Sequence, residues 1–328
     1  MKIRMSGASK KMAPLFILKI LEEYTDEDNT LSRTEICKIL EDNGFEIERK
    51  AVARYLEDLY DAGYDVRGVD TEGASGKKRS EKVYLERDFT HSELQLLIDS
   101  VLFSKHLSSR YAKDLIEKIS DLGSKHFSEK NKAIDRVDSV YHAPNAEYFA
   151  VVGTLQTAIA EDKTVSFKYS GGSKHKFTVS PYYLAVGNDH YYLICVGEDG
   201  KIFHFRLDKI RDVKILSALR KPVQDTPLKG ASIGQYLASH PLLFVGEPER
   251  VVLKIKNDKM GYLCDTFGNS HKVLSSGDEY SEVALYCNPR DMRYWALQYG
   301  EIAEVVAPES LRNEIRGKVA EMAARYGV

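Results

Sequence analysis

The chain has 328 residues, enough for two or three domains that each bury a core of their own. Apolar residues make up 43% and charged residues 29%, which is typical of a globular protein and excludes wholesale disorder. Lys and Arg number 47 and Asp and Glu number 49. The resulting charge of −2 excludes a uniformly basic coat for nucleic acid, but it leaves room for a local basic patch.

Membrane, export and metal signals are missing from the pattern. No apolar run approaches the roughly 20 residues that a membrane helix needs, and no apolar stretch with a cleavage site follows the basic start of the chain. The four cysteines lie far apart and form no C-x-x-C pair. We therefore expect buried thiols, no metal site and a cytoplasmic protein.

Residues 1–89 have the pattern of a small DNA-binding domain. Apolar spacing predicts three helices, and Ser32 with Glu35 forms a capping box at the start of the second helix. Two short strands follow the third helix, and this order is that of a winged helix-turn-helix. The expected ranges are a first helix that ends before 25–29, helices over about 32–42 and 48–62, and strands over about 64–67 and 82–85.

Cations gather where such a fold touches DNA. Arg49, Lys50 and Arg54 lie in the first two turns of the third helix, and Lys50 and Arg54 share a face because they are four residues apart. In this fold the start of that helix meets base edges, while flanking cations meet phosphates. The predicted DNA-contacting residues are Arg33, Arg49, Lys50, Arg54, Lys77, Lys78 and Arg79.

The charge of this domain leaves an alternative open. Residues 1–89 hold 16 Lys and Arg against 19 Asp and Glu, a net of −3. DNA binding therefore needs the charges to be segregated by face. The alternative is a solvated helix and a charged loop, or a winged helix that docks a protein partner. A positive face on the third helix favours DNA, and an acidic or apolar face favours a protein.

Residues 90–143 are interpreted as a helical connector and a candidate dimer surface. Thr90 and Glu93 form a second capping box ahead of one apolar helix, and a second helix is predicted from about Ser109 to Phe127.

Residues 144–220 are predicted to contain one helix and then a small barrel or sandwich. Short apolar runs separated by turn residues every 8–12 positions are typical of such folds. The predicted helix covers about 149–161, and the predicted strands cover 164–169, 175–180, 182–186, 190–196, 202–207 and 213–216.

Residues 221–328 open with a predicted linker, 221–230, and then alternate between strands and helices. The order β-α-β-β-α-β is that of a ferredoxin-like sandwich, here with one more helix at the end. Asn288 followed by Pro289 is a strong helix start, and Asp258 is the predicted cap of the preceding helix. The predicted strands are 251–256, 271–274, 282–286 and 302–306, and the last helix ends at Tyr326.

A polar face is predicted on the strand over 202–207. Alternation sets His204, Arg206 and Asp208 on one side, near tyrosines of the neighbouring segments. A guanidinium beside stacking aromatic rings suits a ligand that carries phosphate. The alternative is a solvent-facing strand with an Arg206–Asp208 pair and structural tyrosines.

Three segments, Ser180–Leu184, Tyr191–Leu193 and His204–Ile210, resemble the signature of the WYL-domain transcriptional regulators. In that family a winged helix is followed by an Sm-like barrel, the WYL domain, and a C-terminal extension. The stretch Tyr294–Gly300 and the one around Pro308 resemble that extension. The Trp of the family name is Tyr191 here, which keeps an aromatic face and leaves the identity of the ligand open.

The resemblance implies a homodimeric regulator that binds a double-stranded operator and senses a nucleotide or a single-stranded nucleic acid. The implied fold class is α+β and multidomain: a winged helix-turn-helix (1–89), the connector (90–143), an Sm/SH3-like barrel (144–220) and a ferredoxin-like domain (221–328). The implied ligand residues are Tyr182, Tyr191, Tyr192, His204, Arg206 and, from the C-terminal domain, Arg293, with Arg290 beside it.

Catalytic motifs are missing from the sequence, so we expect neither an enzyme nor a cofactor. There is no G-x-x-x-x-G-K-[ST], H-E-x-x-H or G-x-S-x-G, and the histidines do not fall at metal-ligand spacings. The alternative function is a protein-binding adaptor or accessory regulator that acts on a nucleic-acid-processing partner.

Overall fold

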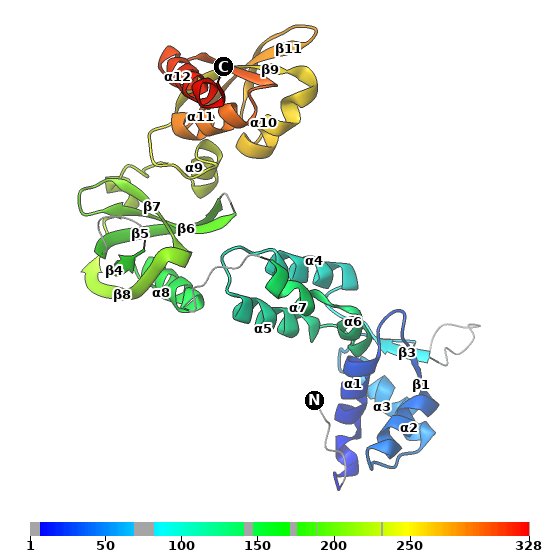
Figure 1. Ribbon diagram of the computed structural model, residues 1–328. Helices are drawn as coiled ribbons and strands as arrows, with labels where there is room; N and C mark the ends of the chain where they lie inside the picture. Colours follow the sequence, from blue (N-terminus) through cyan, green and yellow to red (C-terminus); the bar gives the residue numbers. More distant parts are fainter. Residues whose placement is uncertain are drawn as a thin grey trace. The chain divides into compact units, whose positions relative to one another are not determined.

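The computed structural model describes residues 7–68, 82–140, 147–170, 176–187, 189–230 and 232–327. The chain divides into two compact units, residues 1–143 and 144–328 (Figure 1). Both units combine helices with sheets, which confirms the predicted mixture of α and β structure. No helix of the described ranges is long and apolar enough to cross a membrane.

The first unit consists of helices around one small sheet. Its elements are α1 (Ala13–Tyr24), β1 (Leu31–Ser32), α2 (Arg33–Asp42), α3 (Arg49–Asp61), β2 (Val66–Arg67), β3 (Lys82–Leu85), α4 (His91–Leu102), α5 (Ser109–Ser120), α6 (Lys125–Lys130) and α7 (Ala133–Arg136).

Helices α1 to α3 share one core with the strands that follow them. Ile17, Ile36, Val52 and Val83 from four of these elements are fully buried in it. The predicted capping box is present, since the Ser32 hydroxyl accepts from a backbone N–H while its partner carboxylate accepts from Ser32. The strands form one antiparallel sheet in the order β1-β3-β2.

The helices α4 to α7 bury a second core, and they correct one predicted helix. The helix expected from Ser109 to Phe127 ends at Ser120, and α6 begins after Ser124. The reason is local: the chain turns at Gly123, and the Ser124 hydroxyl then accepts from the Phe127 N–H as a new N-cap. Ser124 also donates to the buried Asp26 carboxylate, which ties the loop after α1 to this helical module.

The second unit holds two sheets. Its elements are α8 (Tyr148–Ala160), β4 (Lys163–Tyr169), β5 (Lys176–Gly187), β6 (His190–Gly197), β7 (Ile202–Arg206), β8 (Ile210–Leu219), α9 (Ile233–Ser239), β9 (Glu249–Lys256), α10 (Met260–Phe267), β10 (Lys272–Ser276), β11 (Tyr280–Cys287), α11 (Pro289–Gln298), β12 (Ala303–Ala307) and α12 (Glu309–Tyr326).

The first sheet of this unit corrects the predicted barrel. Its order is β7-β6-β5-β4-β8, and among the residues that the structure describes no ladder joins the outer strands β7 and β8. The sheet is therefore not closed by pairing. A 3-10 turn, Leu207–Lys209, separates these two strands and sends β8 to pair with β4 instead. The two strands expected over 175–186 are one strand, β5, with a register shift at Pro181.

The second sheet has the order β10-β11-β9-β12, and all its neighbours are antiparallel. Trp295 of α11 and Phe267 of α10 are buried against it. Asn288 caps α11, accepting from the N–H groups of Arg290 and Asp291 as predicted. The predicted Asp258 cap is wrong, because Asp258 lies in a 3-10 turn and α10 begins after it without a side-chain cap.

The segment between the two sheets is more than a linker. It contains α9, which the sequence analysis missed and which lies between the first sheet and the second in Figure 1. Tyr236 of α9 and Leu243 beyond it pack against Ile194 and Val196 of β6, so this segment covers one face of the first sheet.

Candidate functional site

The cations of α3 lie on its exposed face. Val52, Leu56 and Leu59 are the buried stripe of this helix, and at 3.6 residues per turn Lys50 and Arg54 lie on the opposite side. Arg49 is also exposed. Within the described ranges no carboxylate forms an ion pair with these three cations.

The charge of the exposed α3 face changes sign along the helix. Glu57, Asp58 and Asp61, in its second half, are exposed like the cations of the first half. The positive charge is therefore concentrated at the N-terminal end, where the helix dipole adds to it. Arg33 is half-buried at the start of α2. The predicted wing residues Lys77, Lys78 and Arg79 lie outside the described residues.

In the second unit, Arg206 ends β7 in a bidentate ion pair with Asp208. Its Nε donates to Asp208 Oδ1 at 3.0 Å, and its Nη2 donates to Asp208 Oδ2 at 2.7 Å. The Arg206 side chain keeps 25% of its surface exposed and the Asp208 side chain 10%. Burial by itself raises the pKa of Asp208, but the hydrogen bonds and charge of Arg206 outweigh it and hold that pKa below its ordinary value.

Tyrosines surround this pair. Tyr192 of β6 is the cross-strand partner of Arg206, so their side chains are neighbours on one face. The Tyr169 hydroxyl accepts a long hydrogen bond, 3.4 Å, from the Arg206 N–H. Burial, the neighbouring Tyr191 and the Asp208 carboxylate all raise the pKa of Tyr148 on α8. The pair thus lies in a largely phenolic, partly desolvated setting.

His204 lies on the same face of β7 but contacts the segment around α9. Its Nδ1 lies 2.7 Å from the Leu243 carbonyl oxygen, and its Nε2 lies 2.8 Å from the Tyr236 hydroxyl. A carbonyl can only accept, so Nδ1 carries the proton and Nε2 accepts from Tyr236. Burial lowers the pKa of His204 to about 4, which fits this neutral tautomer.

The other predicted ligand residues are engaged elsewhere. The Tyr182 hydroxyl donates to the Lys221 carbonyl, and the guanidinium of Arg220 stacks on the Tyr182 ring. Arg293 forms an ion pair with Glu314. Of the predicted ligand residues, the structure therefore places Tyr192 directly beside Arg206. It also places Tyr191 near Tyr148, which in turn lies near Asp208.

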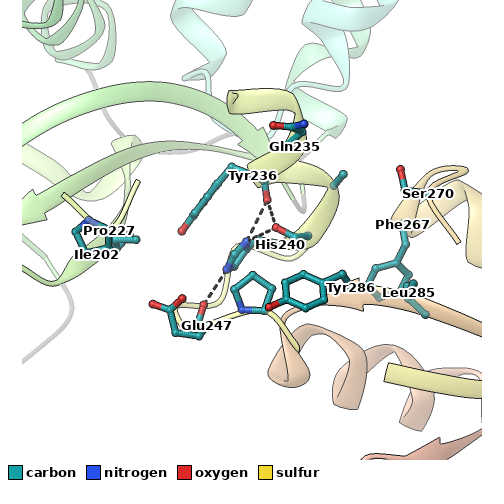
Figure 2. Close-up of a pocket in the computed structure, with 14 residues that line it drawn as sticks. Ile202, Pro227, Gln235, Tyr236, His240, Glu247, Phe267, Ser270, Leu285 and Tyr286 are labelled. Carbon is teal, nitrogen blue, oxygen red and sulfur yellow. Dashed lines mark hydrogen bonds between the residues drawn. The ribbon is translucent and has the colours of Figure 1, made fainter. Parts of the chain in front are cut away.

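A cleft of about 390 Å³ lies beside α9 (Figure 2). Apart from Ile202, it is lined by the segment around α9 and by the second sheet and its helix α10, so it is distinct from the Arg206 pair. The described residues of its lining include Glu247 and no Lys or Arg, which makes the cleft a poor fit for phosphate. Its lining residues are Ile202, Pro227, Gln235, Tyr236, Ala238, Ser239, His240, Gly246, Glu247, Pro248, Phe267, Ser270, Leu285 and Tyr286.

Two buried side chains next to this cleft hold the α9 segment in position. The ring of His240 stacks on Tyr236 at 4.3 Å, and its Nε2 lies 2.9 Å from the Gly246 carbonyl oxygen (Figure 2). Asp291, fully buried near the start of α11, accepts from the N–H groups of Leu242 and Phe244 at 2.8 and 3.2 Å. Burial raises the pKa of Asp291 to about 6, although these hydrogen bonds work against the rise.

The sequence contained a signal for this missed segment. Ser232 and Gln235 form a capping box at the start of α9, with the Ser232 hydroxyl accepting from the Gln235 N–H. The described ranges contain no cluster of three or more His, Cys, Asp and Glu side chains that could hold a metal ion.

Comparison with known families agrees with this architecture. Residues 150–215 match the WYL domain, and residues 247–323 match the WCX domain. The fold and these matches define a multidomain protein with a WYL domain followed by a WCX domain. The chain thus contains a WYL domain and a WCX domain, which confirms the resemblance to the WYL-domain transcriptional regulators found in the sequence.

Two solved structures are similar to this chain at low identity. The proteasome accessory factor B/C (PafBC) of Arthrobacter aurescens is 16% identical with a TM-score of 0.31, and the match covers 100% of this chain and 50% of that one. The chain therefore spans about half the length of that protein. A CRISPR Cas-related protein is 12% identical with a TM-score of 0.40, covering 93% and 97% of the two chains. No curated protein matches the chain.

Proposed function

We propose that the chain is a DNA-binding transcriptional regulator whose WYL domain senses a nucleotide or a single-stranded nucleic acid. The observation that carries the DNA half is the N-terminal half of α3, which exposes Lys50 and Arg54 opposite a buried apolar stripe and exposes Arg49 at its first residue. Cations arranged in this way meet phosphates and base edges when such a helix enters a major groove.

The order of elements supports the finer fold assignments. In the first unit β1 precedes α2, and β3 pairs with both β1 and β2, as in a winged helix-turn-helix. In the second sheet the helices α10 and α11 connect strands that are separated by one antiparallel strand. That arrangement supports a ferredoxin-like C-terminal domain.

The ligand half of the proposal is supported by Arg206. Its guanidinium is a fork that matches two phosphate oxygens, and Tyr192 beside it offers a ring for a base to stack on. The lining of the cleft beside α9, as far as the structure describes it, contains no Lys or Arg, so the Arg206 site is the better candidate for an anionic effector.

We further propose a homodimer that acts in the cytoplasm without catalysing a reaction. Leu96 and Phe103 support a dimer surface on the connector. They are 67% and 63% exposed, and they lie seven residues apart, Leu96 in α4 and Phe103 at its C-cap, about two turns further along the same side. A dimer presents two α3 helices, which fit successive major grooves about one helical turn apart.

The second candidate is an adaptor or accessory regulator for a nucleic-acid-processing partner. The acidic second half of the α3 face, Glu57, Asp58 and Asp61, favours it, because such a surface repels phosphates and suits a basic protein.

Selection from a random duplex library with the full chain tests the proposal. The wild type is expected to enrich a near-palindromic sequence with half-sites about 10 base pairs apart. The double variant Arg49→Ala/Lys50→Ala is expected to enrich nothing. Enrichment of the same sequence by the double variant would remove α3 from the interface, and no enrichment by the wild type would favour the adaptor.

A further inference from the structure

The guanidinium that the proposed function assigns to an anionic ligand is already occupied by an anion of the same chain. Nε and Nη2 of Arg206 donate to the two oxygens of Asp208, which is the geometry that a bound phosphate would need. Any ligand that uses this fork must therefore exchange with the Asp208 carboxylate. The free energy of ligand binding at this site therefore depends on how much more stable the ligand–Arg206 pair is than the Asp208–Arg206 pair.

The local fold delivers this carboxylate to Arg206. Asp208 follows two residues later, in the 3-10 turn Leu207–Lys209, and the fully buried Leu207 anchors that turn. The pair thus joins two residues that lie two positions apart in one turn. Solvent reaches Arg206 more than Asp208, at 25% against 10% exposure, so an incoming anion meets the guanidinium first.

The side chains around Arg206 affect the competition between Asp208 and an incoming anion. Tyr192 and Tyr169 flank the guanidinium, and burial raises the pKa of both, so they stay neutral and offer hydroxyl groups rather than charge. Partial desolvation strengthens each charge-charge contact relative to water. The outcome is then decided by the charge and the oxygens of the competing anion.

We propose that Asp208 is an internal competitor for Arg206 that restricts this site to ligands with a terminal phosphate. The proposal rests on the proposed ligand function of Arg206. A phosphodiester carries one negative charge, as the carboxylate does, and it also loses translational freedom on binding, so it does not displace Asp208. A terminal phosphate monoester carries about −1.5 to −2 at neutral pH and has three acceptor oxygens. It therefore outcompetes the carboxylate.

The test measures binding of two tetrathymidylates that differ only in the 5′ group, phosphate or hydroxyl, to the full chain. The wild type is expected to bind the 5′-phosphorylated form about tenfold more tightly, the contribution of one charge-assisted hydrogen bond. Asp208→Asn is expected to bind the 5′-hydroxyl form about tenfold more tightly than the wild type does, because Arg206 is then free to pair with a phosphodiester.

Asp212→Asn is the matched control. Asp212 forms an exposed ion pair with Lys168 in the same sheet, and its left-handed backbone conformation suits Asn as well as Asp. This variant is expected to bind the 5′-hydroxyl form as weakly as the wild type does.

The outcomes separate the two claims. Equal binding of the two oligonucleotides by the wild type, lost in Arg206→Ala, would overturn the competitor and leave the ligand site standing. That comparison needs no Asp208 variant, so it decides even if Asp208→Asn does not fold. Binding that Arg206→Ala leaves unchanged would overturn both the ligand site and the competitor.

Discussion

The start of α3 and the end of β7 both present arginine, but the two regions treat its charge differently. On α3, Arg49 and Arg54 point to solvent and the described residues offer them no carboxylate partner. On β7, Arg206 is held in a bidentate pair by Asp208. A long polyanion can bind the first region without displacing anything, whereas the second region binds only what outcompetes its own carboxylate.

The local chain geometry differs between the two regions. On a helix a cation can pair with a carboxylate three or four residues away, and Glu57 and Asp58 lie at these distances from Arg54, but in α3 they form no ion pair with it. At the end of β7 the chain turns at once, and the turn carries an acid beside the guanidinium of residue 206. Among the residues that the structure describes, arginine is therefore free of a carboxylate partner at the start of α3 and paired with a carboxylate at the end of β7.

The largest effect is expected when a carboxylate is introduced beside the cations of α3, because this makes α3 resemble the Arg206–Asp208 region. Ala53→Glu introduces an acid four residues after Arg49, on the half-buried flank of the exposed face. We expect operator affinity to fall about 100-fold, since roughly two phosphate or base contacts of 1–3 kcal/mol each are weakened. Ala53→Gln is the control and should bind within a factor of about three, since it adds bulk without charge. Equal affinity of the two variants would mean that the charge of this face does not matter.

The junction around α9 gives a smaller, pH-dependent effect. A carboxyl in an unfolded chain has a pKa near 4, and burial raises the pKa of Asp291 to about 6 in the folded chain. The folded chain therefore holds more protons between these values, and Asp291 makes it more stable as the pH falls from about 6 to about 4. His204 acts in the opposite sense. Its pKa is lowered to about 4, so its contribution to stability is lost as the pH falls below its unfolded value of about 6.5.

Asp291→Asn removes one of these opposing effects. Its free energy of unfolding is expected to fall more steeply than that of the wild type between pH 7 and pH 5, by on the order of 1–2 kcal/mol. Urea unfolding at the two pH values measures the difference. The exposed Asp278 is the control position, and Asp278→Asn should follow the wild type. A parallel pH profile for Asp291→Asn would show that the buried carboxyl does not titrate in this range.

Elements with strong local signals were predictable from sequence. The capping boxes at Ser32 and Thr90 and the cap at Asn288 are all formed, because each depends on residues within one turn. Closure of the first sheet was not predictable, because it depends on whether β8 pairs with β4 or β7, and strand periodicity does not choose a partner. The α9 capping box at Ser232 was visible but lay just beyond a Pro-containing segment that we took for a linker.

In the candidate site, too, the local contacts could be predicted from the sequence and the long-range contacts could not. Strand alternation and the aromatic pattern predict that Tyr192 and Arg206 are close, and the register of β6 and β7 makes them direct partners. The Arg206–Asp208 pair was one of two alternatives, and spacing alone did not decide between them. The contacts of His204 could not be predicted, because Tyr236 lies 32 residues away in a helix that was not predicted and Leu243 lies 39 residues away, beyond that helix.

The most direct test of the account measures operator affinity of the full chain with and without 5′-phosphorylated tetrathymidylate, in the wild type and in Arg206→Ala. The wild-type affinity should change by about 5- to 150-fold when the ligand is added, the usual range of coupling between two sites. Arg206→Ala should bind the operator as well as the wild type does without ligand, and its affinity should not respond. A full response in Arg206→Ala would contradict the claim that this arginine receives the ligand.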